Sequence, residues 1–162
     1  MGSILFLFAG AVIAQIALMK DASSGLQVEL QSHPAVSYLE EGIPVKIVFK
    51  NTNDNPIRIL NAFDQPRALP VFFRFNVRDE NGKSVSLPKG GKISLSENSI
   101  KYIELKKWEI FELSVNLRDI IPADTVLKPG TYTVSVTYKN QYREDCFKGE
   151  IKGNTTQVSL NE

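Results

Sequence analysis

From residue 26 to the end of the chain, apolar and polar side chains alternate with a period of two. The alternation is clearest over 26–31, 45–50 and 131–138, where one face of each segment is apolar and the other is mostly polar. This pattern is typical of strands that are buried on one side. No segment after residue 25 keeps a helical period over three turns. The pattern therefore predicts an all-β domain.

We expect about eight or nine short strands in this domain, which is typical of a sandwich or a barrel. Ten segments are candidates for these strands: 26–30, 45–49, 57–60, 73–77, 85–87, 93–95, 100–105, 108–117, 132–138 and 156–160. Asn51–Pro56 is rich in turn-forming Asn and Asp, and Asp79–Gly82 predicts a hairpin turn. Asn61–Pro70 is a longer loop with two prolines, and Asp119–Asp124 is expected to form a single helical turn that Pro122 interrupts.

The segment Leu127–Tyr132 favours a sandwich over a barrel. It has the spacing of a tyrosine corner, in which a Tyr near the start of a late strand sends its hydroxyl back to upstream backbone. Pro129 and Gly130 would make the turn, and Leu127 is placed to enter the core. The alternative is an ordinary turn followed by a core Tyr132. The predicted fold is an immunoglobulin-like antiparallel β-sandwich preceded by an N-terminal hydrophobic segment.

That hydrophobic segment carries no charged side chain over residues 1–19. An apolar run that ends in small side chains is typical of a secretory signal, although no Lys or Arg precedes this one. If Ile4–Met19 is kept, it is an anchor close to the shortest length that spans a bilayer. We expect a signal or anchor with its linker over 1–25 and the sandwich over 26–162. The location is then secreted or periplasmic, or else membrane-anchored with the sandwich outside the cytoplasm.

The composition fits a folded domain and argues against a polyanion partner. Hydrophobic residues make up 43% of the chain and charged residues 23%, so a sizeable core can form. The 19 basic residues are balanced by 18 acidic ones, for a net charge of +1. Nucleic-acid binders usually show a basic excess on one face. We therefore expect no nucleic-acid partner, and membrane contact only through a retained N-terminal segment.

The chain offers little for catalysis or metal binding. His33 is its only histidine and Cys146 its only cysteine, so no usual zinc site or nucleophile–histidine arrangement can be recognised. We expect Cys146 to be a buried, small apolar side chain, with pairing to another chain as the alternative. Asn51–Asn55 offers oxygen donors but lacks the spacing of a calcium loop. We predict a protein that is not an enzyme and has no cofactor and no metal site.

Candidate binding residues lie in the loop Asn61–Pro70 and beside the lysines at 106–107. The loop combines apolar side chains, rigid prolines and an arginine that can make two parallel hydrogen bonds. An exposed Trp is a common interface anchor. The candidates are Phe63, Pro66, Arg67, Leu69, Pro70 and Trp108. The alternative is that the loop crosses between the sheets and packs on the core, and that Trp108 is a core or strand-edge residue.

Residues 42–53, and 128–134 followed by 148–151, resemble a family of extracytoplasmic bacterial domains. They are similar to non-catalytic domains found beside some bacterial lysine-specific metalloendopeptidases, and more distantly to bacterial intracellular proteinase inhibitors. The resemblance covers roughly 26–160 and consists mainly of turns, so it implies a fold more than an activity. These 162 residues hold no protease domain, and an export segment fits an intracellular inhibitor poorly.

The sequence therefore predicts an exported binding or accessory module that contacts another protein through loops or a strand edge. Two alternatives stay open. One is a proteinase inhibitor, and the other is a membrane-tethered structural subunit of a larger assembly.

Overall fold

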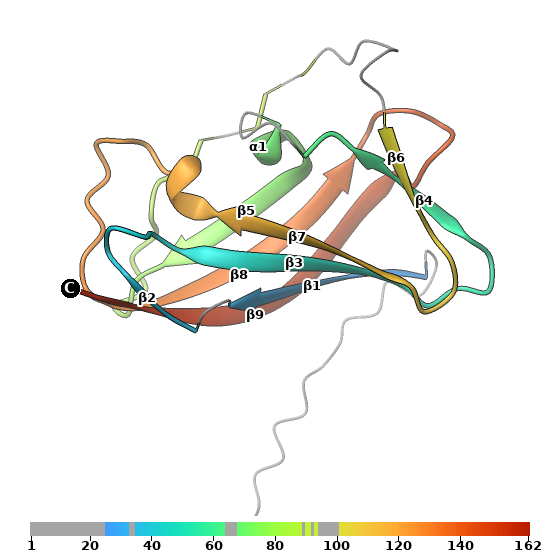
Figure 1. Ribbon diagram of the computed structural model, residues 1–162. Coiled ribbons are helices and arrows are strands. Elements are labelled where there is room, and N and C mark those ends of the chain that lie inside the picture. The colour runs from blue at the N-terminus through green and yellow to red at the C-terminus, as the bar shows by residue number, and fades with distance from the viewer. Residues whose placement is uncertain (1–24, 33–34, 64–67, 89, 92, 94–100) are drawn as a thin grey trace, which may run out of the picture.

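The computed structural model describes residues 25–32, 35–63, 68–88, 90–91, 93 and 101–162 (Figure 1). Its elements are β1 (Leu26–Ser32), β2 (Val36–Tyr38), β3 (Pro44–Asn51), β4 (Ile57–Asn61), α1 (Leu69–Phe72), β5 (Phe73–Arg78), β6 (Lys101–Leu105), β7 (Ile110–Asn116), η2 (Leu117–Asp119), β8 (Gly130–Asn140) and β9 (Gly149–Asn161). The predicted signal or anchor segment lies in residues 1–24, outside the described residues. Across the described ranges, no helix has the length and apolar character needed to cross a membrane.

The strands form two packed layers, which Figure 1 shows one in front of the other. One sheet has the order β1-β3-β7, and the other has the order β2-β9-β8-β5. β2 pairs with β9 in parallel, and the other pairings within these two sheets are antiparallel. The described residues contain nine strands. The predicted immunoglobulin-like β-sandwich is therefore confirmed.

The core lies between the layers, on the apolar face of each alternating strand. Along β8 the buried residues alternate with half-exposed ones, as the period of two predicts. Aromatic rings fill the centre of the core: the Phe49 and Tyr138 ring centroids are 5.0 Å apart, and those of Phe63 and Phe73 are 5.2 Å apart. Such ring pairs add to the stability gained from burial alone.

β4 and β6 continue the β3–β7 pair as one bent ribbon. The β3–β7 register ends at Lys50 opposite Ile110, and the β4–β6 register begins at Ile57 opposite Leu105. Asn51, which is fully buried, holds the bend because its Nδ2 donates to the carbonyl oxygens of Leu105 at 2.8 Å and Asn55 at 2.9 Å. The turn between β6 and β7 projects from this bend.

The tyrosine-corner hydrogen bond is present. The Tyr132 hydroxyl donates to the Lys128 carbonyl oxygen and accepts from the Lys128 backbone N–H, both at 2.9 Å. Tyr132 and Leu127 are both buried, so the segment is fixed to the core at the start of β8. This side chain therefore does more than fill space, since it satisfies two backbone groups in the connection to β8.

The structure differs from the predicted strands at several places. Residues 85–87 form no strand, and the chain just before them meets β5 at an isolated bridge between Arg78 and Ser84. Of the candidate strand 93–95 only Ile93 is described, and it lies outside the strands. The helical turn begins at Leu117 rather than Asp119, because the Asn116 side chain accepts from the Arg118 N–H at 3.0 Å and caps it there.

Two further strand features were missed. β2 is only three residues long and has a single buried side chain, so it carries no detectable alternation. β9 begins at Gly149, well before the predicted 156–160, because pairing with β8 extends into a polar sequence. A register shift in β8 between Ser135 and Thr137 lies near Gly153, where an added Cβ would come within 2.8 Å of the Val136 side chain.

Candidate functional site

A cavity of about 540 Å³ lies beside β5, the last strand of its sheet. We call it the β5 pocket. Its lining residues are Pro70, Val71, Phe73, Arg74, Phe75, Leu87, Pro88, Gly90, Gly91, Ile120, Thr137, Lys139, Gln141 and Tyr142. Ligand sites in proteins commonly have volumes in this range. The sequence predicted binding through loops or a strand edge, and both lie at this pocket.

The edge of β5 is only partly covered. The segment after the Asp79–Gly82 turn returns along its end, where the Val85 N–H donates to the Val77 carbonyl oxygen at 2.9 Å. In the described part of the chain, no strand pairs with the other side of Phe73–Asn76. An uncovered strand edge can accept an extended peptide through main-chain hydrogen bonds.

The helix α1 and the segment around Gly90 close one wall of the pocket. Pro70 is the second residue of α1, and the Leu69 and Phe72 side chains of this helix are buried. Gly90 approaches this helix so closely that a Cβ at residue 90 would lie 2.0 Å from the Pro70 carbonyl oxygen. Glycine is therefore required for this close approach. The wall depends on contact between two segments twenty residues apart in sequence.

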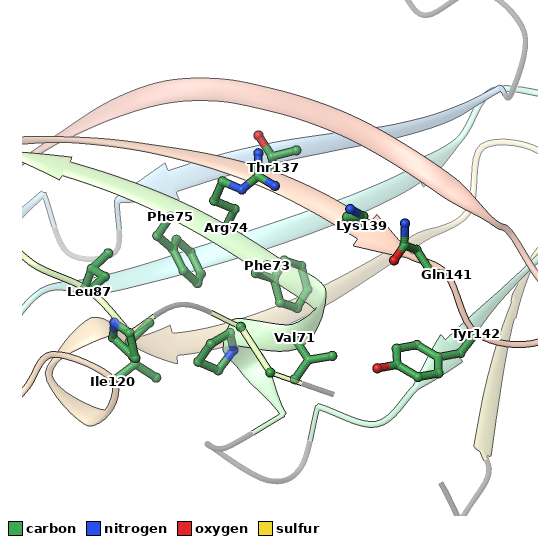
Figure 2. Close-up of a pocket in the computed structure, with 14 residues that line it drawn as sticks. Val71, Phe73, Arg74, Phe75, Leu87, Ile120, Thr137, Lys139, Gln141 and Tyr142 are labelled. Atoms are coloured by element: carbon green, nitrogen blue, oxygen red, sulfur yellow. The ribbon is translucent and has the colours of Figure 1, made fainter. Parts of the chain in front are cut away.

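The pocket has an apolar side and a basic side. In Figure 2, Val71, Leu87 and Ile120 lie on one side, and Arg74, Thr137 and Lys139 lie along the strands on the other. Arg74 and Thr137 are cross-strand partners in the β5–β8 pair. Neither Arg74 nor Lys139 forms a salt bridge with any described residue. No described acidic side chain therefore competes with an anionic group for these two cations.

Tyr142 closes the end of the pocket near the β8–β9 connection. Its ring packs on Phe72 with centroids 5.7 Å apart, and its hydroxyl accepts from the Ile93 N–H at 3.3 Å. The buried Asn140 fixes this connection, because its Oδ1 accepts from the Tyr142 N–H and its Nδ2 donates to the Phe147 carbonyl oxygen. The shape of this end is therefore set by hydrogen bonds as well as by packing.

The candidate loop residues are only partly at the pocket. Phe63 and Leu69 are 5% and 6% exposed and belong to the core, so their side chains serve packing in this structure. Pro70 lines the pocket. Pro66 and Arg67 lie outside the described residues. For Phe63 and Leu69 the placement matches the alternative reading, in which the loop packs on the core.

Trp108 lies outside the core, in the turn between β6 and β7. Its side chain is 58% exposed, and it does not line the β5 pocket. The structural residues Leu127, Pro129, Gly130 and Tyr132 lie together in the tyrosine corner described above.

Arg74, Lys139 and Tyr142 were not among the residues predicted to bind. The sequence places Arg74 and Lys139 on the polar face of their strands, where charged side chains are ordinary. Their shared place at the pocket depends on the β5–β8 register, which no short motif encodes. The one available signal was that β5 carries two basic residues, Arg74 and Arg78, and no acidic one.

The described residues contain no group of three or more His, Cys, Asp or Glu side chains placed to hold a metal ion. Burial raises the pKa of the Cys146 thiol, and its Sγ lies 3.4 Å from Asn140 Nδ2. A raised pKa lowers the thiolate fraction and hence the reactivity of this cysteine. His33 lies outside the described residues.

No known protein family and no curated protein matches the chain. Among solved structures, a β-glucosidase from Listeria innocua is similar at 14% identity and a TM-score of 0.41, over 85% of this chain and 16% of that one. The CARDB domain of the PF1109 protein from Pyrococcus furiosus, solved in complex with di-metal ions, is similar at 15% identity and a TM-score of 0.37. That similarity covers 83% of this chain and 91% of the CARDB domain.

The alkylpurine DNA glycosylase AlkC from Pseudomonas fluorescens is similar at 14% identity and a TM-score of 0.41, over 85% of this chain and 31% of that one. The chain thus spans only a small part of the two enzymes. Likenesses this distant assign no activity, ligand or partner to it.

Proposed function

We propose that the chain is a non-catalytic binding or accessory module outside the cytoplasm, and that it holds a segment of another protein in the β5 pocket. The observation that supports this most directly combines three features of the described residues: a strand edge that no other strand covers, an apolar wall, and two cations, Arg74 and Lys139, that form no salt bridge there. An extended segment would add main-chain hydrogen bonds along Phe73–Asn76. Its apolar side chains would pack on Val71 and Leu87.

The two cations suggest the chemistry of the segment. A carboxylate of the partner would pair with Arg74 and Lys139, which lie on neighbouring strands at the pocket rim. Arg suits such a contact because its guanidinium can bind a carboxylate through two parallel hydrogen bonds. The proposed partner is therefore an extended, partly apolar segment with an acidic residue or a free C-terminus.

The test is a comparison of three proteins: the wild type, an Arg74→Glu/Lys139→Glu double variant, and an Arg78→Glu control. Arg78 is exposed on the same face of β5 but does not line the pocket. We expect the protein that co-purifies with the wild type to bind the control with similar affinity and the double variant at least tenfold more weakly. Equal affinity for all three would remove the pocket from the proposal.

The resemblance to domains beside lysine-specific metalloendopeptidases is consistent with an accessory role, and the more distant one to proteinase inhibitors keeps inhibition as the alternative. A panel of proteinases separates the two, because an inhibitor lowers their rates and an accessory module does not. Turnover of any substrate by the isolated chain would contradict the non-catalytic part of the proposal.

A further inference from the structure

Trp108 occupies a backbone conformation that disfavours its own side chain. Its φ is +67°, in the left-handed region that glycine adopts without strain. The Glu109 N–H donates to the Lys106 carbonyl oxygen at 3.0 Å, so residues 106–109 form a β-turn with Trp108 at the third position. Type II turns place glycine at this position for the same reason. A bulky aromatic here costs conformational energy and, being 58% exposed, recovers little of it by burial.

The turn is nevertheless firmly held. The Trp108 N–H donates to the Asn51 carbonyl oxygen at 2.7 Å, and the Glu109 carboxylate accepts from the Lys106 N–H at 2.8 Å. Asn51 is itself fixed by its buried side-chain hydrogen bonds. The indole is therefore displayed on a rigid support, which lowers the ordering entropy that a contact would cost.

Two lysine side chains lie against the indole. The Nζ atoms of Lys50 and Lys107 lie 5.2 and 5.7 Å from the centroid of the Trp108 ring. Ile110, which pairs with Lys50 across the strands, is also exposed. We call Lys50, Lys106, Lys107, Trp108 and Ile110 the tryptophan tip. A Trp flanked by lysines suits a bilayer surface, where the indole enters the interface and the amines meet anionic headgroups.

The tryptophan tip lies where the described chain begins. The Thr52 N–H donates to the Gly25 carbonyl oxygen at 2.7 Å, and Asp54, two residues on, forms an ion pair with Lys107 at 2.5 Å. Gly25 is thus next to the loop that touches the tip. Only Lys20–Ser24 separate Gly25 from the apolar segment Ile4–Met19, a reach of about 20 Å when extended.

We propose that the tryptophan tip docks on an anionic lipid bilayer while Ile4–Met19 is retained as an anchor, so that this end of the sandwich faces the membrane. The proposal goes beyond the β5 pocket and rests on the membrane-anchored alternative. One Trp and a few lysines bind a bilayer weakly by themselves. The short tether raises their effective concentration at the surface, which makes docking favourable.

The experiment uses the full chain in vesicles, because Trp108 is the only tryptophan of the protein. Its emission and its quenching therefore report directly on the tip. In vesicles of phosphatidylcholine and phosphatidylglycerol, we expect a shift to shorter wavelength, quenching by brominated lipids and protection from iodide. Phosphatidylcholine alone should give a smaller effect, and added salt should reduce the anionic contribution.

Charge variants give effects of opposite sign. Lys50→Gln should lower the ratio of docked to free tips about fivefold, and Asp54→Asn should raise this ratio about fivefold. Lys128→Gln is the matched control and should change nothing. Lys128 lies two residues before β8, and β8 starts at the end of the sandwich opposite the β6–β7 turn (Figure 1). Each variant is compared between anionic and uncharged vesicles, so that direct effects of Lys50 on the indole cancel.

Three results would overturn the proposal. The first is equal access of iodide to Trp108 in anionic and in uncharged vesicles. The second is a Lys128→Gln effect as large as that of Lys50→Gln. The third is a native chain, measured by mass spectrometry, that begins after Ala14 and so lacks the anchor. None of these results bears on partner binding in the β5 pocket, so the two proposals can fail separately.

Discussion

The Asn154 side chain on β9 pairs with both backbone polar groups of Leu30 on β1. Its Nδ2 donates to the Leu30 carbonyl oxygen at 2.9 Å, and its Oδ1 accepts from the Leu30 N–H at 2.5 Å. A side-chain amide thereby takes the place of a neighbouring strand's backbone and ties one sheet to the other. The residues at 154–156 also form an Asn-Thr-Thr sequon, but here the amide nitrogen is engaged within the domain.

Replacing Asn154 by Ala should lower the free energy of unfolding by about 1–2 kcal/mol, because two hydrogen bonds to the backbone of the buried residue Leu30 are lost. Denaturant unfolding measures the change. Asn81→Ala is a suitable control, since Asn81 is exposed in the turn after β5 and no side-chain hydrogen bond of its own is observed within the described residues. Equal stability of the Asn154→Ala protein and the wild type would show that water replaces the amide without loss.

Tyr132→Phe should destabilise the domain by about 1 kcal/mol or more. The hydroxyl both donates to and accepts from Lys128 backbone, so its removal leaves two polar groups to find new partners. Thermal and denaturant unfolding provide the measurement, with Tyr38→Phe as the control because Tyr38 is 52% exposed. An unchanged melting curve would mean that the hydrogen bonds of the Tyr132 hydroxyl add nothing to the stability of the domain.

Tyr138→Phe should act in the opposite direction. Tyr138 is fully buried, and its hydroxyl has no hydrogen-bond partner among the described residues. A buried hydroxyl without a partner costs about 1–3 kcal/mol of desolvation, so its removal should raise stability by about 1 kcal/mol at neutral pH. A loss of stability on this substitution would indicate a partner for the hydroxyl that these residues do not supply.

The same residue predicts a loss of stability in alkali. Burial, and secondarily the nearby Cys146 thiol, raises the pKa of Tyr138 well above its usual value near 10. Above about pH 10 the unfolded chain releases this proton and the folded chain keeps it. The unfolded state then binds fewer protons, so the free energy of unfolding falls as pH rises. Unfolding curves from pH 8 to 11 should show a smaller fall for Tyr138→Phe than for the wild type.

Glycine at residue 108 should give a more stable protein than alanine at residue 108, by about 1 kcal/mol. Both substitutions remove the indole and its contacts with Lys50 and Lys107. They differ in the left-handed backbone, which alanine tolerates poorly and glycine adopts freely. Comparing the Trp108→Gly and Trp108→Ala proteins by denaturant unfolding measures the energetic cost of the left-handed backbone for a residue with a Cβ. Equal stabilities would mean that the turn relaxes once the indole is gone.

The sequence by itself determined the fold class. Alternating segments such as 26–30 and 132–138 bury one face in a sandwich or a barrel, so an all-β fold follows from a local pattern. The corner at Leu127–Tyr132 was also predictable, because donor and acceptor lie within a few residues of each other. Both features depend on neighbours along the chain, which is why a sequence pattern can report them.

The pocket and the tip were decided by the tertiary structure. Arg74 and Lys139 line one pocket only because β5 and β8 pair in one register, and Gly90 meets Pro70 only because its segment packs against α1. Phe63, a candidate for binding by sequence, is instead held in the core by its aromatic neighbours. Trp108 was a candidate too, but its left-handed backbone and the lysines around it depend on how the bent ribbon turns at Asn51. Contacts between residues far apart in sequence depend on packing and register, which local patterns do not encode.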